Sequence, residues 1–244
     1  MVFPRDTISE AAVSSLPITS AEGKDENFTS VLTDSWEAYN GRQDVEAQTL
    51  ELVTAVLVGI GLSAACGFRV FVPLLGASIA AHSGYLQLSP EFSWLGSTPA
   101  LLAFALATIL EFGAYSVPFL DHLMDAVATP AAVIAGTLLM ASLLGEASPF
   151  LRWSLAIIAG GGAAGLVQAG SVMARGSTAV MTGGFGNLVV ALLEFAGAAV
   201  MTLLALLVPV LAVIGLVIGL LMVRALVRRS RTKNNLSKPL PPPA

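Results

Sequence analysis

The sequence is poor in charge and in cysteine, and it lacks the common catalytic signatures. Only 11% of its 244 residues are charged and its mean hydropathy is +0.81, so most of the chain is suited to lipid. A single cysteine, Cys66, excludes an intrachain disulfide and a thiolate metal site within one chain. The sequence has no HExxH motif, nucleophile elbow, Walker A loop or dinucleotide fingerprint. We therefore expect no enzymatic activity, no cofactor and no bound metal.

Charge is scarce in the middle of the chain because it is concentrated at the two ends. Residues 1–51 hold ten of the sixteen acids against three bases, and residues 224–244 hold six of the twelve bases. The opening residues lack a basic segment followed by an apolar one, so they are not typical of a secretory signal. Basic residues beside a span stay in the cytoplasm, which predicts a cytoplasmic C-terminus. We interpret 1–48 as an acidic, mostly disordered tail, 49–228 as a transmembrane domain and 229–244 as a basic, proline-rich tail.

Apolar runs rich in leucine, alanine and glycine fill residues 49–228 without any alternation of period two. Because backbone in hydrocarbon must satisfy its own hydrogen bonds, this pattern predicts an all-α, polytopic transmembrane helical bundle rather than a barrel. About 20 residues cross a bilayer, so the run 49–84 is too long for one crossing and too short for two. Residues 70–84 predict a re-entrant segment or half-helix that starts at Pro73. The six expected spans are 49–68, 99–117, 128–146, 152–173 and two within 188–228, divided at Pro209.

Two pairs of short motifs indicate an internal repeat. "GLSAACGFR" at 61–69 and "GLVQAGSVMAR" at 165–175 both begin Gly-Leu-x-x-Ala and end at an arginine. "LEFGAYSV" at 110–117 and "LEFAGAAV" at 193–200 share Leu-Glu-Phe and a valine. Two units of three spans must be inverted relative to one another, so the pattern favours a 3+3 inverted repeat with a shared site near the bilayer midplane. Chance matching among such common residues is the alternative interpretation.

The motifs place four charged residues inside or beside apolar spans: Arg69, Glu111, Arg175 and Glu194. Ionisable groups within a membrane are expensive and mark ion or substrate pathways. We therefore predict that Glu111 and Glu194 bind protons or cations, or line a polar path with Arg69 and Arg175. The alternative is a structural ion pair that fixes the bundle. Arg69 lies between a glycine-rich helix and Pro73, which predicts a helix break where a carbonyl or carboxylate holds it.

A loop that begins at Arg175 is the third candidate feature. Its sequence, "RGSTAVMTGGFGN", offers the hydroxyl of Thr182 and close backbone approach at Gly183 and Gly184. Asn187 is suited to cap the following helix, whose N-terminus would favour an anion. This pattern suggests a cradle for a phosphate or carboxylate, although such loops are more often plain turns.

A secondary polar cluster, "DHLMD", holds Asp121, His122 and Asp125. The two aspartates are four residues apart and would share one face of a helix. Metal binding and general acid-base catalysis are both compatible with these residue types. We favour a solvated, helix-capping loop at the membrane interface, because no second group of matching ligands is found.

The motifs resemble those of a bacterial membrane family called DUF4126, a domain of unknown function. The resemblance rests on "GLSAACGFRVFVPLL", "PFLDHLMD" and "RGSTAVMTGGFGNLVVALLE", which occur in order, and it covers about residues 50–210. Members often have a second acid after the glutamate that matches Glu194, where this chain has Phe195. They also often have a charged residue where this chain has Tyr115 and Ser116. The resemblance implies a polytopic membrane protein but brings no established activity.

These observations favour a transporter or channel that moves a small solute or ion through a polar site between two half-bundles. A non-transporting membrane organiser or assembly factor, which recruits partners through its tails, is the main alternative. An enzyme acting on lipid head groups through the DHLMD cluster is a third, less favoured class. We expect the bacterial inner membrane as the location, with membrane lipids and a small solute or ion as partners. The sequence is compatible with a homo-oligomer, and we expect no nucleic-acid partner.

Overall fold

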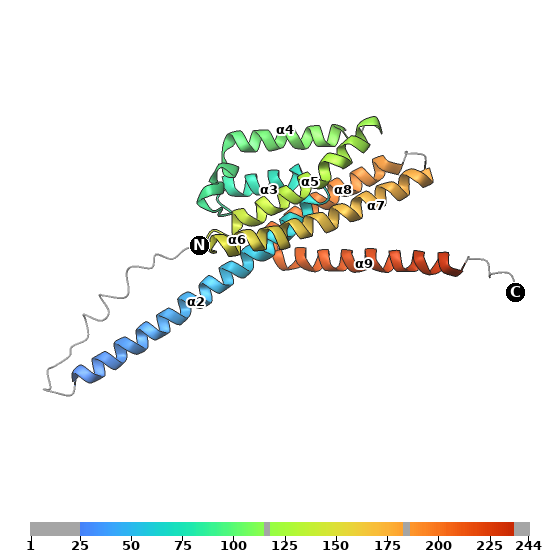
Figure 1. Ribbon diagram of the computed structural model, residues 1–244. Coiled ribbons are helices and arrows are strands. Elements are labelled where there is room, and N and C mark those ends of the chain that lie inside the picture. Colours follow the sequence, from blue (N-terminus) through green and yellow to red (C-terminus); the bar gives the residue numbers. More distant parts are fainter. Residues whose placement is uncertain (1–24, 115–117, 183–185, 237–244) are drawn as a thin grey trace. The chain divides into compact units, whose positions relative to one another are not determined.

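The computed structural model describes residues 25–114, 118–182 and 186–236, and the regular structure in these ranges is helical (Figure 1). This confirms the all-α prediction. The chain divides into two units, Met1–Thr49 and Leu50–Ala244. The elements are α2 (Asp25–Cys66), α3 (Phe71–His82), η1 (Pro90–Gly96), α4 (Thr98–Ala114), α5 (Pro118–Leu143), α6 (Pro149–Leu155), η2 (Ala156–Gly161), α7 (Gly162–Thr182), α8 (Gly186–Leu207) and α9 (Pro209–Leu236).

The described part of the first unit is helical rather than disordered. α2 begins at Asp25, so residues 25–48 of the expected disordered tail belong to a helix. This stretch contains one glycine, Gly41, and no proline, so nothing in it strongly opposes helix formation. Trp36 and Tyr39 are both exposed on this helix, and their rings stack with centroids 5.9 Å apart.

Three helical segments among the described residues are long and apolar enough to cross a membrane. They are Ser35–Cys66, Pro149–Thr178 and Val189–Leu207. A fourth arises if Pro90–Gly96 and Thr98–Ala114, which meet at a 60° bend, form one span. Shorter apolar helices cover Phe71–His82, Val127–Leu143 and Pro209–Met222. The chain is therefore a helical membrane protein, whereas the count of six spans and the 3+3 inverted repeat stay predictions.

α3 is the half-helix that the sequence predicts after the first span. It covers 12 residues, Phe71–His82, and therefore starts two residues before the expected Pro73. A proline is tolerated there because N–H groups in the first turn of a helix have no partner within it. α3 packs against α4 and α8, which gives this short helix protein rather than lipid on those sides (Figure 1).

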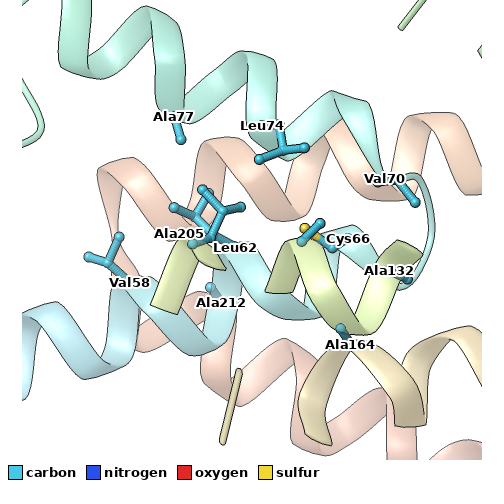
Figure 2. Close-up of a cluster of buried hydrophobic side chains, with 12 residues drawn as sticks. Val58, Leu62, Cys66, Val70, Leu74, Ala77, Ala132, Ala164, Ala205 and Ala212 are labelled. Atoms are coloured by element: carbon cyan, nitrogen blue, oxygen red, sulfur yellow. The ribbon is translucent and has the colours of Figure 1, made fainter. Parts of the chain in front are cut away.

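The core of the second unit is built largely from small side chains. Leu62 and Cys66 of α2 pack with Leu74 of α3 (Figure 2), and alanines from α3, α5, α7, α8 and α9 belong to the same cluster. Small residues let membrane helices approach closely enough for van der Waals contact. A Cβ atom at Gly160 would lie 2.6 Å from the Cβ of Met140, so α5 and η2 need a glycine there. This packing buries the end of α2, and the segment that carries Arg69 follows directly. The alanines are Ala77, Ala132, Ala135, Ala164, Ala205 and Ala212.

Candidate functional site

A break between α2 and α3 positions Arg69. Helix α2 ends at Cys66 and α3 begins at Phe71, and the backbone N–H groups of residues 67–69 turn back to the carbonyls of Ala64 and Ala65. Arg69 is only 2% exposed. Its Nη2 donates to the carbonyl oxygen of Ala191 at 3.1 Å and lies 3.4 Å from Oε2 of Glu194. The helix break and the carboxylate partner therefore occur as the sequence predicts.

Glu194 of α8 binds a second arginine from α7. Arg175 donates from Nε to Oε1 at 2.9 Å and from Nη2 to Oε2 at 2.6 Å, which is a bidentate ion pair. Arg175 is 3% exposed and Glu194 is 5% exposed. Charge-assisted pairs of this geometry are among the strongest polar contacts in proteins. One carboxylate therefore holds two buried guanidinium groups, from α7 and from the helix break.

The side-chain carboxylate of Glu111, on α4, binds backbone N–H groups at the same helix break. The N–H of Val70 donates to Oε1 at 2.9 Å, and the N–H of Phe71 donates to Oε2 at 3.2 Å. These N–H groups lie at the N-terminus of α3, where helical N–H groups lack partners within the helix and the helix dipole favours negative charge. The Glu111 carboxylate thus caps the half-helix from another element.

The two Leu-Glu-Phe motifs meet at this site. Glu194 contacts Arg69, and Glu111 contacts the next two residues of the chain. The rings of Phe112 and Phe195 also meet edge to face, with centroids 5.4 Å apart. Arg69 and Arg175 both attract the Glu111 carboxylate electrostatically. The two glutamates therefore contact consecutive residues of one helix break, and two arginines balance two glutamates when all four are charged.

Sequence reasoning missed two neutral polar residues beside this network. Gln168 and Ser171 of α7 are buried, and Gln168 Nε2 and Ser171 Oγ have no hydrogen-bond partner within the described ranges. A Cβ atom at Gly67 would lie 2.9 Å from the backbone nitrogen of Gln168, so a glycine at 67 lets the end of α2 approach α7. The available signal was the spacing 168, 171 and 175, which places both residues on the helical face that carries Arg175.

The predicted loop beginning at Arg175 is wrong for most of its length. Helix α7 continues to Thr182, and α8 begins at Gly186. The hydroxyls of Ser177 and Thr178 donate to the carbonyls of Met173 and Ala174 four residues earlier, which allows polar residues to lie within the helix.

The remaining cradle residues are incompletely described. Gly183 and Gly184 lie outside the described residues, and Thr182 is the last residue of α7. Asn187 lies within the first turn of α8 rather than before it. The side chains of Thr182 and Asn187 also lie outside the description, so the anion cradle stays a prediction.

The DHLMD cluster lies in a helix, not in the expected interfacial loop. Pro118 opens α5, and the helix runs through residues 121–125 to Leu143. Proline is favoured at such a position, since its missing N–H has no partner in the first turn. The backbone places Asp121 and Asp125 four residues apart on one helical face, whereas the side chains of Asp121, His122 and Asp125 lie outside the described part.

The fold and the buried ion-pair network define a helical membrane protein with a polar site at a broken helix. The chain belongs to the family described as "Domain of unknown function (DUF4126)", whose family model matches residues 56–229. This match confirms the resemblance on the motifs, and it contains the four charged residues of the site. No curated protein and no solved structure matches the chain.

Proposed function

We propose that the protein is a non-enzymatic transporter or channel for a small solute or ion, with its polar site at the break between α2 and α3. The observation that carries the proposal is the convergence of Arg69, Glu111, Arg175 and Glu194 from four separate segments. In many transporters a discontinuous helix presents its ends to substrate and coupling ions near the midplane. In support of the proposal, α2 and α3 are separated by a break, with carboxylates at the N-terminus of α3 and beside the preceding arginine.

The two carboxylates and the two arginines have complementary roles in this proposal. Glu111 and Glu194 bind or relay the coupling cation, for which a proton is the simplest candidate. A proton on Glu194 removes its negative charge and weakens its hold on Arg69 and Arg175. The guanidinium groups then become available to the anionic part of a substrate. The proposed setting is the bacterial inner membrane, with the C-terminus in the cytoplasm.

Reconstituted flux tests this proposal. The full chain is placed in proteoliposomes, and an enclosed pH-sensitive dye reports proton movement under a pH gradient with chloride, phosphate or acetate present. We expect Glu111→Gln and Glu194→Gln to abolish the flux, because neither glutamine can bind and release a proton. Glu146→Gln is the matched control, since Glu146 is exposed between α5 and α6.

Two results would contradict transport through this site. One is a wild-type rate no higher than that of empty vesicles with all three anions. The other is unchanged flux in glutamine variants that are shown to be folded by their thermal unfolding.

A second candidate function is a membrane organiser. The exposed apolar side chains of the first unit favour it: Trp36, Tyr39 and Val45 are 54%, 50% and 62% exposed. Large exposed aromatic residues are typical of protein contact surfaces. Deleting residues 1–45 or 232–244 should then abolish the recovery of partner proteins, whereas a transporter should retain its flux.

A further inference from the structure

An apolar cavity lies between α3, η1, α4 and α5, beside the start of α3. Its volume is about 290 Å³, and the described residues around it expose almost no polar atom to it. Val70 and Phe71 are part of the lining, but their backbone N–H groups already donate to Glu111. The cavity therefore suits an apolar ligand.

Water does not suit this cavity. A buried water needs two to four polar partners, which the described lining does not supply. Apolar cavities of about 150 Å³ in other proteins stay dry and bind benzene. Small-molecule sites begin at about 300 Å³, so a cavity of about 290 Å³ is large enough for a slender hydrocarbon. Such a ligand would supply the van der Waals contacts that an empty cavity denies its lining.

The lining on α5 is elongated along the helix. Ala131, Ile134, Ala135 and Leu138 are three or four residues apart and share one face, which spans about 10 Å at 1.5 Å per residue. Two lining residues also reach the molecular surface, because Ile134 is 58% exposed and Trp94 is 53% exposed. The cavity is thus open to the outside, and a long, thin ligand can enter it sideways.

η1 gives the cavity one end with the character of a membrane interface. Trp94 lines the cavity, whereas Glu91 of the same short helix is exposed and pairs with Arg152 at 3.1 Å. Charged groups beside a tryptophan are typical of the level of lipid head groups. Phe104, another lining residue, lies about 9 Å further along α4 than Thr98 at 1.5 Å per residue. A lipid with its head group near η1 can therefore extend a chain to Phe104.

The surroundings and the size of the cavity favour lipid over a second copy of the chain. The outer side of α4 carries exposed leucines, Leu102, Leu106 and Leu110, which hydrocarbon covers in a membrane protein. An α-helix with its side chains is about 10–12 Å wide, too wide to enter a cavity of about 290 Å³. A single hydrocarbon chain has no such difficulty.

We propose that this cavity binds one acyl chain of a membrane phospholipid. The chain packs between Phe104 of α4 and the face of α5 that contains Ala131 and Ala135. It also touches Val70 and Phe71, whose N–H groups bind Glu111, so the lipid contacts the helix start at the polar site. Binding of the lipid does not depend on the proposed transport.

Lipid retention by the full chain tests this site. The protein is reconstituted in phosphatidylcholine, extracted in a mild detergent and weighed by native mass spectrometry together with the lipid that it keeps. The wild type should retain one phosphatidylcholine per chain. Ala131→Phe fills the cavity and should lower the retained fraction about tenfold or more, because several methylene groups lose their burial. Ala103→Phe is the matched control, since Ala103 is exposed on α4 and does not line the cavity.

Two results would overturn the site: a wild type that keeps no phosphatidylcholine, or equal retention by Ala131→Phe and Ala103→Phe. If Ala131→Phe does not fold, a crystal of the unaltered protein with phosphatidylcholine brominated in its acyl chain gives the answer. An anomalous bromine signal between Phe104 and Ala135 supports the site. Water, detergent or a side chain of a second copy in that place overturns it. Neither measurement involves flux, so both are independent of the test of transport.

Discussion

The two Leu-Glu-Phe segments share a sequence but hold different partners. Glu111 caps backbone N–H groups at the start of α3, whereas Glu194 binds the side chains of Arg69 and Arg175. The difference follows from the groups that each glutamate meets. The break after α2 frees N–H groups for Glu111, whereas Glu194 meets the side chain of Arg69 at the break and that of Arg175 on the unbroken α7. Free N–H groups thus make one carboxylate a helix cap, and buried arginines make the other an ion-pair partner.

The largest expected effect comes from removing the charge of Glu194. Glu194→Gln leaves two buried guanidinium groups without their shared carboxylate, and breaking a buried ion pair costs about 3–5 kcal/mol of unfolding free energy. Urea unfolding in detergent, followed by circular dichroism, measures the loss. The control substitution Glu146→Gln, at an exposed residue, should change the free energy of unfolding by less than about 0.5 kcal/mol. A loss for Glu194→Gln equal to that of the control would mean that the ion pairs contribute nothing.

Gly67→Ala should have the next largest effect, because it pushes the end of α2 away from α7. The new Cβ would lie 2.5 Å from the carbonyl oxygen of Ala164, and overpacking of this kind costs about 1–3 kcal/mol. Gly170→Ala, where a Cβ meets nothing within 4 Å, is the control and should be neutral or stabilising. The free energies of unfolding of Gly67→Ala and Gly170→Ala are compared by the same urea measurement. Equal stability of both variants would show that α2 does not require the glycine to approach α7.

Glu111→Gln should cost less than Glu194→Gln, because a glutamine oxygen still accepts one N–H at the start of α3. Loss of a helix cap costs about 0.5–2 kcal/mol. Hydrogen exchange followed by mass spectrometry should show faster exchange at Val70 and Phe71, with the middle of α8 unchanged. Unchanged exchange at both amides would contradict the capping role.

The smallest expected effect concerns the ring contact between α4 and α8. A double-mutant cycle of Phe112→Leu and Phe195→Leu should give a coupling of about 0.5–1.5 kcal/mol for an edge-to-face pair. Additive losses in the cycle would show that the two motifs are neighbours without mutual stabilisation.

Charged residues were the most predictable part of the site. A lone arginine or glutamate in an apolar run must find a partner, so the pairing of Glu194 with Arg69 and Arg175 could be expected from the cost of burial alone. The half-helix α3 was equally predictable, because residues 70–84 are too few for a full crossing of the membrane. The sequence did not indicate that Glu111 would accept hydrogen bonds from backbone N–H groups and that Glu194 would pair with the guanidinium groups. That choice depends on where the packed helices end.

Neutral polar residues were far less predictable. Ser177 and Thr178 resemble loop residues, yet their hydroxyls bond to carbonyls of the preceding turn and keep α7 helical. Gln168 and Ser171 are buried in the same helix, but Gln168 Nε2 and Ser171 Oγ have no hydrogen-bond partner among the described residues. Local sequence does not separate these cases, because the outcome depends on which face of α7 meets α2.

The contacts of Arg69 also constrain the order in which the chain matures during synthesis. Its carbonyl partner Ala191 lies 122 residues further along, and Glu194 is made later still. A growing chain therefore delivers Arg69 to the membrane well before α8 exists. Glu111, which caps α3, is synthesised sooner, because it lies only 41 residues after Val70 in the chain. Glu111, the cap of the half-helix, is thus synthesised before Ala191 and Glu194, the two described partners of Arg69.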